Sequence, residues 1–277
     1  MTNAHRRKVL RTRRGALALA VVLGAGSFAL SGASATHMTV TAVRGSAQTC
    51  RAVFNFFGQP QPPVTGTTVT LPPGGSATPI TASEPCTVRI TFPNGTPGPI
   101  ILSAASVDVR TQGTTGPTGS VTSTATATDV GTDPNEALQA TSITSTCSAS
   151  EAGVTGSTTV IGGTVVTDQN AGTTAVVPEN PTPNYAIEGI NGAGDRYRYV
   201  FNEQVVNPDG SITVRAVHLY LLGPNATGDV ILGEVTCGVT TTTAPTTTST
   251  TTAPTTTSTT TAPTTTSTTT APTTTST

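Results

Sequence analysis

The sequence predicts an all-β fold: an antiparallel β-sandwich, Ig-like in architecture, with a small N-terminal β region and a disordered C-terminal Thr/Pro tail. Three observations predict this fold class. Short segments alternate apolar with polar residues, often Thr with Ala or Val, which is typical of strands and disfavours helices. Clusters of Gly, Pro, Asn and Asp separate these segments, as turns do. The chain also has four cysteines, an even number that suits disulfide-stapled domains.

Residues 1–35 have the composition of an export signal. A basic start is followed by the apolar run 15–30, which is short for a membrane span, and Ala33-Ser34-Ala35 resembles a cleavage site. Sec export is the simpler interpretation, and the pair Arg13-Arg14 leaves the twin-arginine route open. We therefore expect a secreted, extracellular or cell-envelope-associated product without a transmembrane span in the mature chain. Six of the basic residues lie in this segment: Arg6, Arg7, Lys8, Arg11, Arg13 and Arg14.

Removal of the signal changes the charge balance of the product. The whole chain has 13 basic and 14 acidic residues, so seven arginines and no lysine remain against all 14 acids, a formal charge of −7. An acidic product is poorly suited to nucleic acid, whose binding requires a basic surface. Nucleic-acid partners are therefore not expected.

The four cysteines, Cys50, Cys86, Cys147 and Cys237, all lie in the mature part of the chain. Four cysteines allow three pairings. We favour Cys50–Cys86 and Cys147–Cys237, because each pair then stays within one candidate domain. The spacing of metal-binding cysteines, such as Cys-x-x-Cys, is absent, so disulfides are the preferred interpretation and no cofactor is expected.

The mature chain is predicted to contain three parts: a small β domain or extension at 36–98, a main β domain at 99–239, and a stalk at 240–277. In the first part, 86–92 is the clearest strand and 51–57 is its expected partner. The Pro- and Gly-rich segment 93–99 marks the boundary. In the main domain we expect strands at 100–110, 120–130, 140–147 and 158–166, either a short helix or a loop at 133–138, and a long loop at 167–184.

Three further strands are predicted between Tyr197 and Cys237. They cover 196–206, 211–222 and 229–237, and the turn clusters NPDG and GPNATG separate them. Strict alternation places Glu203 on the inward face of the first strand, with the tyrosines. It also places His218 on the face opposite Arg215 in the second strand.

Parts of this region resemble a known family. The segments FNEQ (201–204), ITVRAVHLYLL (212–222) and GDVILGEVTCG (228–238), with 140–163 around the first cysteine of the main domain, are similar to the choice-of-anchor P family. The resemblance covers about half the chain. It implies an exported actinobacterial β domain followed by varied anchoring tails, and it implies no catalytic residues.

The segment 240–277 repeats the unit TTTAPTTTS every nine residues and carries no charge. Without large apolar residues it cannot form a core, and Thr and Ser with Pro are typical of extended stalks. Both an O-glycosylated stalk and an unmodified tail remain open.

The sequence offers few candidates for chemistry. There is no G-x-S-x-G elbow, and a buried structural role for His218 is preferred over a catalytic one. Asp195, at the end of the turn NGAGD, and Asp229 are candidates for a calcium site, with ordinary turn chemistry as the simpler interpretation.

We therefore expect a non-catalytic structural or interaction protein rather than an enzyme. Its partners would be cell-envelope glycans or host or other extracellular proteins. The alternative is a carbohydrate- or calcium-dependent ligand-binding, adhesin-like domain.

Overall fold

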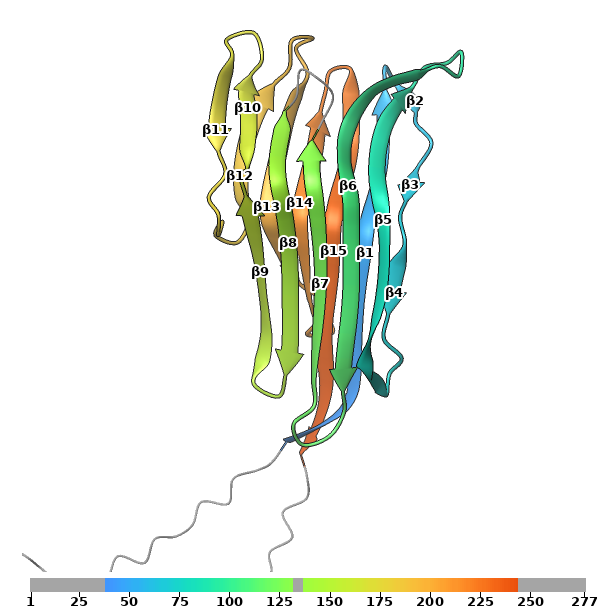
Figure 1. The fold of residues 1–277 in the computed structure, drawn as a ribbon, viewed down its shortest axis with the longest axis vertical. Helices are drawn as coiled ribbons and strands as arrows, with labels where there is room; N and C mark the ends of the chain where they lie inside the picture. The colour runs from blue at the N-terminus through green and yellow to red at the C-terminus, as the bar shows by residue number, and fades with distance from the viewer. Residues whose placement is uncertain (1–37, 132–136, 244–277) are drawn as a thin grey trace, which may run out of the picture. The chain divides into compact units, whose positions relative to one another are not determined.

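The computed structural model describes residues 38–131 and 137–243. These residues form fifteen strands and no helix, so the all-β prediction is confirmed (Figure 1). In the same two ranges no helix is long and apolar enough to span a membrane. The predictions for 1–35, for 133–136 and for 244–277 lie outside the described residues.

The strands in chain order are β1 (Met38–Phe56), β2 (Gln59–Pro60), β3 (Val64–Thr65), β4 (Thr68–Thr70), β5 (Gly75–Thr91), β6 (Pro97–Thr114), β7 (Ser120–Gly131), β8 (Leu138–Ser150), β9 (Gly153–Ile161), β10 (Thr164–Asp168), β11 (Thr173–Val176), β12 (Tyr185–Ile190), β13 (Arg196–Val206), β14 (Ile212–Leu222) and β15 (Ala226–Thr243).

Hydrogen bonds join all of these strands into one curled sheet. The strand order is β2-β1-β15-β14-β13-β12-β10-β8-β7-β6-β5, while β3 and β4 pair with β1, β9 with β8 and β11 with β10. The sheet is mixed, because β10 meets β12 in parallel at Asp168 and Ile190. The predicted two-sheet, Ig-like sandwich is therefore not confirmed. Strands from both sides of residue 98 belong to the same sheet, since β5 pairs with β6.

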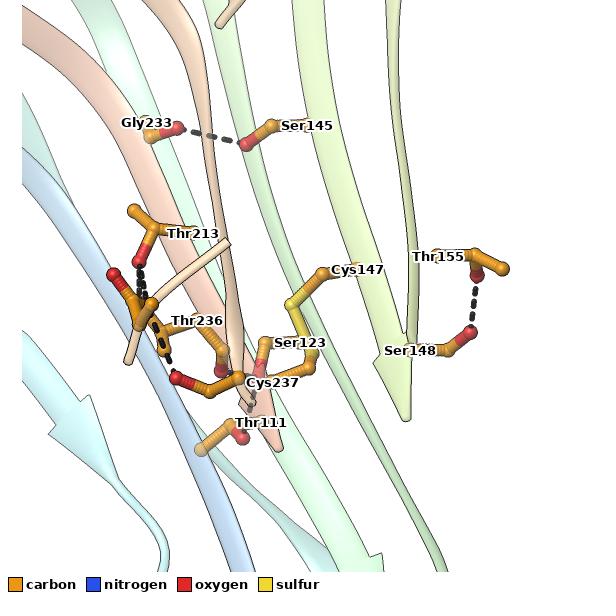
Figure 2. The surroundings of a disulfide bond; sticks show 12 residues. Thr111, Ser123, Ser145, Cys147, Ser148, Thr155, Thr213, Gly233, Thr236 and Cys237 are labelled. Carbon is orange, nitrogen blue, oxygen red and sulfur yellow. Dashed lines mark hydrogen bonds between the residues drawn. A yellow bond between two sulfur atoms is a disulfide. The ribbon is translucent and has the colours of Figure 1, made fainter. Parts of the chain in front are cut away.

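The curl brings β1, β14 and β15 across the interior from β6, β7, β8 and β9. Small side chains allow this close approach. Ser145 Oγ on β8 donates a hydrogen bond to the carbonyl oxygen of Gly233 on β15 at 2.8 Å (Figure 2). A Cβ atom on Gly45 would lie 2.4 Å from the Thr111 hydroxyl, so a larger residue there would push the two layers apart. Small residues thus let the two layers approach closely at these positions.

Two disulfides hold the curl, with the pairing that the sequence analysis favours. Cys147 on β8 and Cys237 on β15 form the interior disulfide, which crosses between the two layers (Figure 2). Cys50 on β1 and Cys86 on β5 form the edge disulfide, which links strands near opposite ends of the strand order. Each bridge therefore joins segments that do not pair through backbone hydrogen bonds.

Several predicted elements differ from those observed. The segments 51–57 and 86–92 are not partners, because β1 pairs with β15 and β5 pairs with β6. The Cys50–Cys86 disulfide links β1 to β5 instead. The predicted strand 158–166 is divided between β9 and β10 at Gly162, which has a φ of +66°. The predicted loop 167–184 contains β11, and the first four residues of the predicted tail, 240–243, belong to β15.

Candidate functional site

The alternation of inward and outward residues reverses in one row that crosses four neighbouring strands. In β14, the successive residues Ala216 and Val217 are both fully buried. Asn202 on β13 and Gly233 on β15 lie opposite Ala216 and have φ angles of +52° and +65°. In β1 the row continues at Thr49, which is buried like its successor Cys50. The pairing on either side keeps its register, so the strands continue through the row while their faces exchange.

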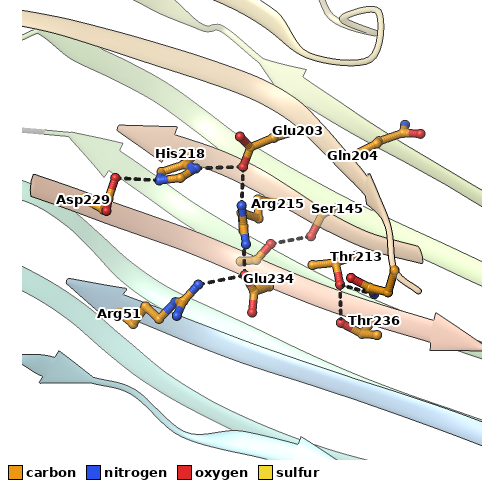
Figure 3. Close-up of polar contacts among 12 residues, drawn as sticks. Arg51, Ser145, Glu203, Gln204, Thr213, Arg215, His218, Asp229, Glu234 and Thr236 are labelled. Carbon is orange, nitrogen blue, oxygen red and sulfur yellow. Dashed lines mark hydrogen bonds and ion pairs between the residues drawn. The ribbon is translucent and has the colours of Figure 1, made fainter. Parts of the chain in front are cut away.

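This reversal corrects the predicted faces of β13 and β14. Strict alternation separates Arg215 from His218 and places Glu203 with the inward tyrosines. Instead, Arg215 and His218 lie on the same outer surface and both contact Glu203 (Figure 3). The prediction was wrong because a single left-handed or bulged residue exchanges the faces of every residue after it.

Charged side chains on this outer surface form a chain of contacts that we call the Glu203 ladder. Arg215 is at its centre: Nε lies 2.6 Å from Glu234 Oε2, and Nη1 lies 2.6 Å from Glu203 Oε2 (Figure 3). Arg51 extends the ladder to β1, with Nη2 3.4 Å from Glu234. The ladder thus joins β1, β15, β14 and β13 by alternating positive and negative groups.

The other half of the ladder surrounds the imidazole ring of His218. Nδ1 lies 2.7 Å from Glu203 Oε2, and Nε2 lies 3.1 Å from Asp229 Oδ1. The His218 ring stacks on the Tyr220 ring with 3.8 Å between centroids. The guanidinium of Arg198 lies over the Tyr220 ring, 4.7 Å from its centroid. The buried, satisfied His218 agrees with the structural role expected from the sequence.

Electrostatics in the ladder favour the ionised form of Glu203. Partial burial raises the pKa of Glu203, but hydrogen bonds from His218, Tyr220 and Arg215 outweigh burial and lower the pKa to about 2. Burial and the bond to Glu203 raise the pKa of the Tyr220 phenol to about 12. Both oxygens of Glu203 already accept hydrogen bonds, at 2.6 Å from Tyr220 and 2.6 Å from Arg215. These bonds link Glu203 on β13 to Arg215 and Tyr220 on β14.

The two calcium candidates lie in different surroundings. Asp195 is buried, and its carboxylate accepts hydrogen bonds from the backbone N–H groups of Asn225 and Ala226, which ties the β12–β13 turn to the β14–β15 turn. Asp229 lies further along β15 and faces His218. Within 38–131 and 137–243, no group of three or more His, Cys, Asp or Glu side chains could hold a metal ion.

A hollow of about 440 Å³, which we call the tip hollow, opens at the end of the sheet where β1 finishes and β15 begins. Apolar side chains from six strands, β1, β5, β6, β13, β14 and β15, form most of its wall, and polar side chains from the turns contribute to its rim. The wall includes Ile90, Ile100, Ile101, Tyr199, Leu219 and Leu221. A concave, mainly apolar site with a few polar groups is the usual form of a ligand pocket.

Phe57 stands between the tip hollow and a second hollow of about 360 Å³ that it also lines. Its side chain is 66% exposed, and its φ angle is +48°, an uncommon conformation for a bulky residue. Its N–H donates to the carbonyl oxygen of Asn225 at 2.7 Å, which fixes this turn. Phe56 packs edge-on against it and against Phe92, with centroid distances of 4.5 and 6.3 Å. The chain thus displays an aromatic side chain at the tip.

The tip lies far from Met38 and Thr243, the first and last residues that the structure describes. β1 runs from Met38 to Phe56 and β15 returns from Ala226 to Thr243, so Met38 and Thr243 are paired at the opposite end of the sheet (Figure 1). At about 3.3 Å per residue, a 19-residue strand separates these ends by roughly 60 Å. The tip hollow therefore lies at the end of the sheet opposite Met38 and Thr243.

A third hollow of about 620 Å³ lies on the outer surface of β5, β6 and β7, and we call it the polar hollow because most of its lining residues have polar or charged side chains. Its lining includes Ser83, Asp108, Arg110, Gln112, Thr122 and Thr124. These side chains present hydroxyl, amide and charged groups on a shallow sheet surface.

Sequence reasoning missed the tip hollow, because its wall comes from segments as distant as Phe56 and Leu221. The aromatic run that ends at Phe57 was the one local signal. No family model matches the sequence, and comparisons with curated proteins and with solved structures found no match. The resemblance to the choice-of-anchor P family therefore stays a prediction.

Proposed function

We propose that this chain is a non-catalytic, exported module of an actinobacterial cell surface that binds a partner through its tip. Two disulfides support export, because such bonds form and persist in oxidising compartments. On this proposal the two layers of the curled sheet act as an Ig-like β-sandwich, and the Thr/Pro segment acts as a stalk. Its partners would be cell-envelope glycans or extracellular proteins.

The observation that carries the proposal is the position of the tip hollow. An apolar hollow and an exposed aromatic side chain are costly to expose to water, and in soluble proteins they mark binding sites. Here they lie at the end of the sheet opposite Met38 and Thr243, where a stalk would present them to the surroundings.

The test compares two serine variants of equal starting exposure. Phe57 at the tip and Val53 on the side of β1 are both 66% exposed. We expect Phe57→Ser to reduce retention of the purified full chain on actinobacterial cell envelopes, and Val53→Ser to leave retention unchanged. Thermal unfolding of both variants shows whether each remains folded. Equal retention of wild type and Phe57→Ser, with both folded, would refute tip binding.

The polar hollow on β5, β6 and β7 favours a second candidate, the binding of a glycan. Sugar hydroxyls pair with side chains of the kind that Asp108, Arg110 and Gln112 provide there. We expect Asp108→Ala with Arg110→Ala to abolish signals on a glycan array while Phe57→Ser preserves them. Loss on Phe57→Ser alone would assign glycan binding to the tip instead.

A further inference from the structure

We propose, resting on the proposed function, that the tip hollow binds a single-chain amphiphile with an anionic head. The aliphatic chain would lie against the apolar wall, and the head would lie at the rim beside Arg196. The shared chemistry is that of a fatty-acid carboxylate or another alkyl anion.

The wall of the hollow is suited to a flexible apolar chain. Ile100, Ile101 and Leu221 line the hollow and are only partly buried, so they leave apolar surface for a ligand to cover. The Tyr197 ring also lines the hollow, but its hydroxyl is already used, since it donates to the carbonyl oxygen of Val166 at 2.6 Å. The Tyr197 phenol is therefore committed to β10.

Most polar groups on the rim are occupied by one another. Asn191 Oδ1 accepts hydrogen bonds from the N–H groups of Ala193 and Asp195, both at 2.9 Å. The carboxylate of Asp195 accepts from the backbone and the side chain of Asn225. Gln169 Oε1 accepts from the N–H of Gly192. These bonds fix the shape of the rim and leave Asp195 poorly placed to attract a cationic ligand.

Arg196 differs from these neighbours. Its side chain is 69% exposed, and its contact with Glu188 is long, at 3.8 Å. A guanidinium has five N–H donors and stays charged, so Arg196 keeps donors for a carboxylate or sulfate group. Its backbone N–H donates to the carbonyl oxygen of Gly223 at 2.7 Å, which holds the residue at the rim. Arg196 therefore favours a ligand whose head group is negatively charged.

The experiment is calorimetric titration of the full chain with hexanoate, octanoate and decanoate below their micelle concentrations. Full burial of each methylene predicts about four-fold tighter binding per carbon until the hollow is filled. Octyltrimethylammonium and octyl glucoside supply cationic and neutral heads on a matched chain. We expect octanoate to bind more tightly than either. Binding that does not depend on chain length, or equal binding of the cationic amphiphile, would overturn the inference.

Three variants locate the site. Leu221→Ser should weaken decanoate binding at least ten-fold, since it places a hydroxyl on the apolar wall. Arg196→Gln should weaken octanoate binding about two- to five-fold and leave octyl glucoside unaffected, because an exposed ion pair is worth little. Val53→Ser, on the side of β1, should change neither. Unchanged affinity in Arg196→Gln, which is exposed and should fold normally, would overturn the role of the head.

This inference and the proposed function can fail separately. If wild type binds no amphiphile while Phe57→Ser still loses envelope retention, the tip binds another partner and only the ligand class is wrong. If amphiphiles bind as expected while retention does not depend on Phe57, the hollow is a ligand site and the surface-binding role is wrong.

Discussion

Replacement of Glu203 by Gln should destabilise the sheet in a pH-dependent way. The folded chain holds the pKa of Glu203 at about 2, against 4.5 for the free side chain, because Arg215, His218 and Tyr220 donate to the carboxylate. A difference of this size corresponds to about 3 kcal/mol of stability at neutral pH. The Gln side chain keeps one acceptor, so we expect a loss of about 2 kcal/mol for Glu203→Gln.

The sign of the pH dependence follows from the lowered pKa. Ionised Glu203 contributes its full stabilisation above pH 4.5 and loses it as the pH falls towards 2. The assay is urea unfolding of wild type and Glu203→Gln at several pH values between 7 and 2, with disulfides intact. The difference in free energy of unfolding should be largest near neutrality and shrink in acid.

Glu188→Gln is the matched control, because the ion pair of Glu188 with Arg196 is exposed and long, at 3.8 Å. We expect a change below about 0.5 kcal/mol for this variant. Equal stability of wild type and Glu203→Gln at pH 7, or a difference that does not vary between pH 5 and 2, would refute this account of the ladder.

Three other results are expected. Replacing both cysteines of the interior disulfide by Ala should lower the free energy of unfolding by about 4 to 5 kcal/mol. The loss for the edge disulfide should be roughly 1 kcal/mol smaller, because its sequence separation is 36 rather than 90. Denaturant unfolding measures both losses. Gly189→Ala should lower the free energy of unfolding by about 2 kcal/mol, since its Cβ would lie 2.4 Å from the Tyr197 ring, whereas Gly74→Ala, which has open space, should be neutral. Ultraviolet titration should detect phenols that ionise with a pKa of about 12, from Tyr197 and Tyr220, and Tyr220→Phe should remove one of them; no loss would contradict the bond to Glu203.

Local patterns were sufficient where strands alternate regularly. The segment 120–130, with its Thr and Ala alternation, is β7 within one residue, and the turn NPDG does join β13 to β14. The buried tyrosines of β13 also follow from period-two alternation. In each case the residues carry their own signal, because backbone pairing and burial on one face act over a few residues.

Alternation did not predict which face each residue takes on the two sides of Asn202, Ala216 and Gly233. An Asn or a Gly inside a strand does not by itself reveal a left-handed φ, and Ala216 carries no signal at all. Which residues beyond this row point inward depends on Asn202, Ala216 and Gly233 lying opposite one another, and only the pairing of β13, β14 and β15 decides that. The Glu203 ladder could not be assembled from the sequence for this reason.

The sequence by itself determined that the described chain is built of strands, because alternation and turn residues are local properties, and it favoured one of three possible cysteine pairings, which the structure confirms. The tertiary structure decided that all strands join one curled sheet and that Phe57 and Leu221 share a hollow at its tip. Those features depend on which strand edges meet after the chain closes. Backbone hydrogen bonds of equal strength are available to every strand, so side-chain pattern alone does not choose among the possible neighbours.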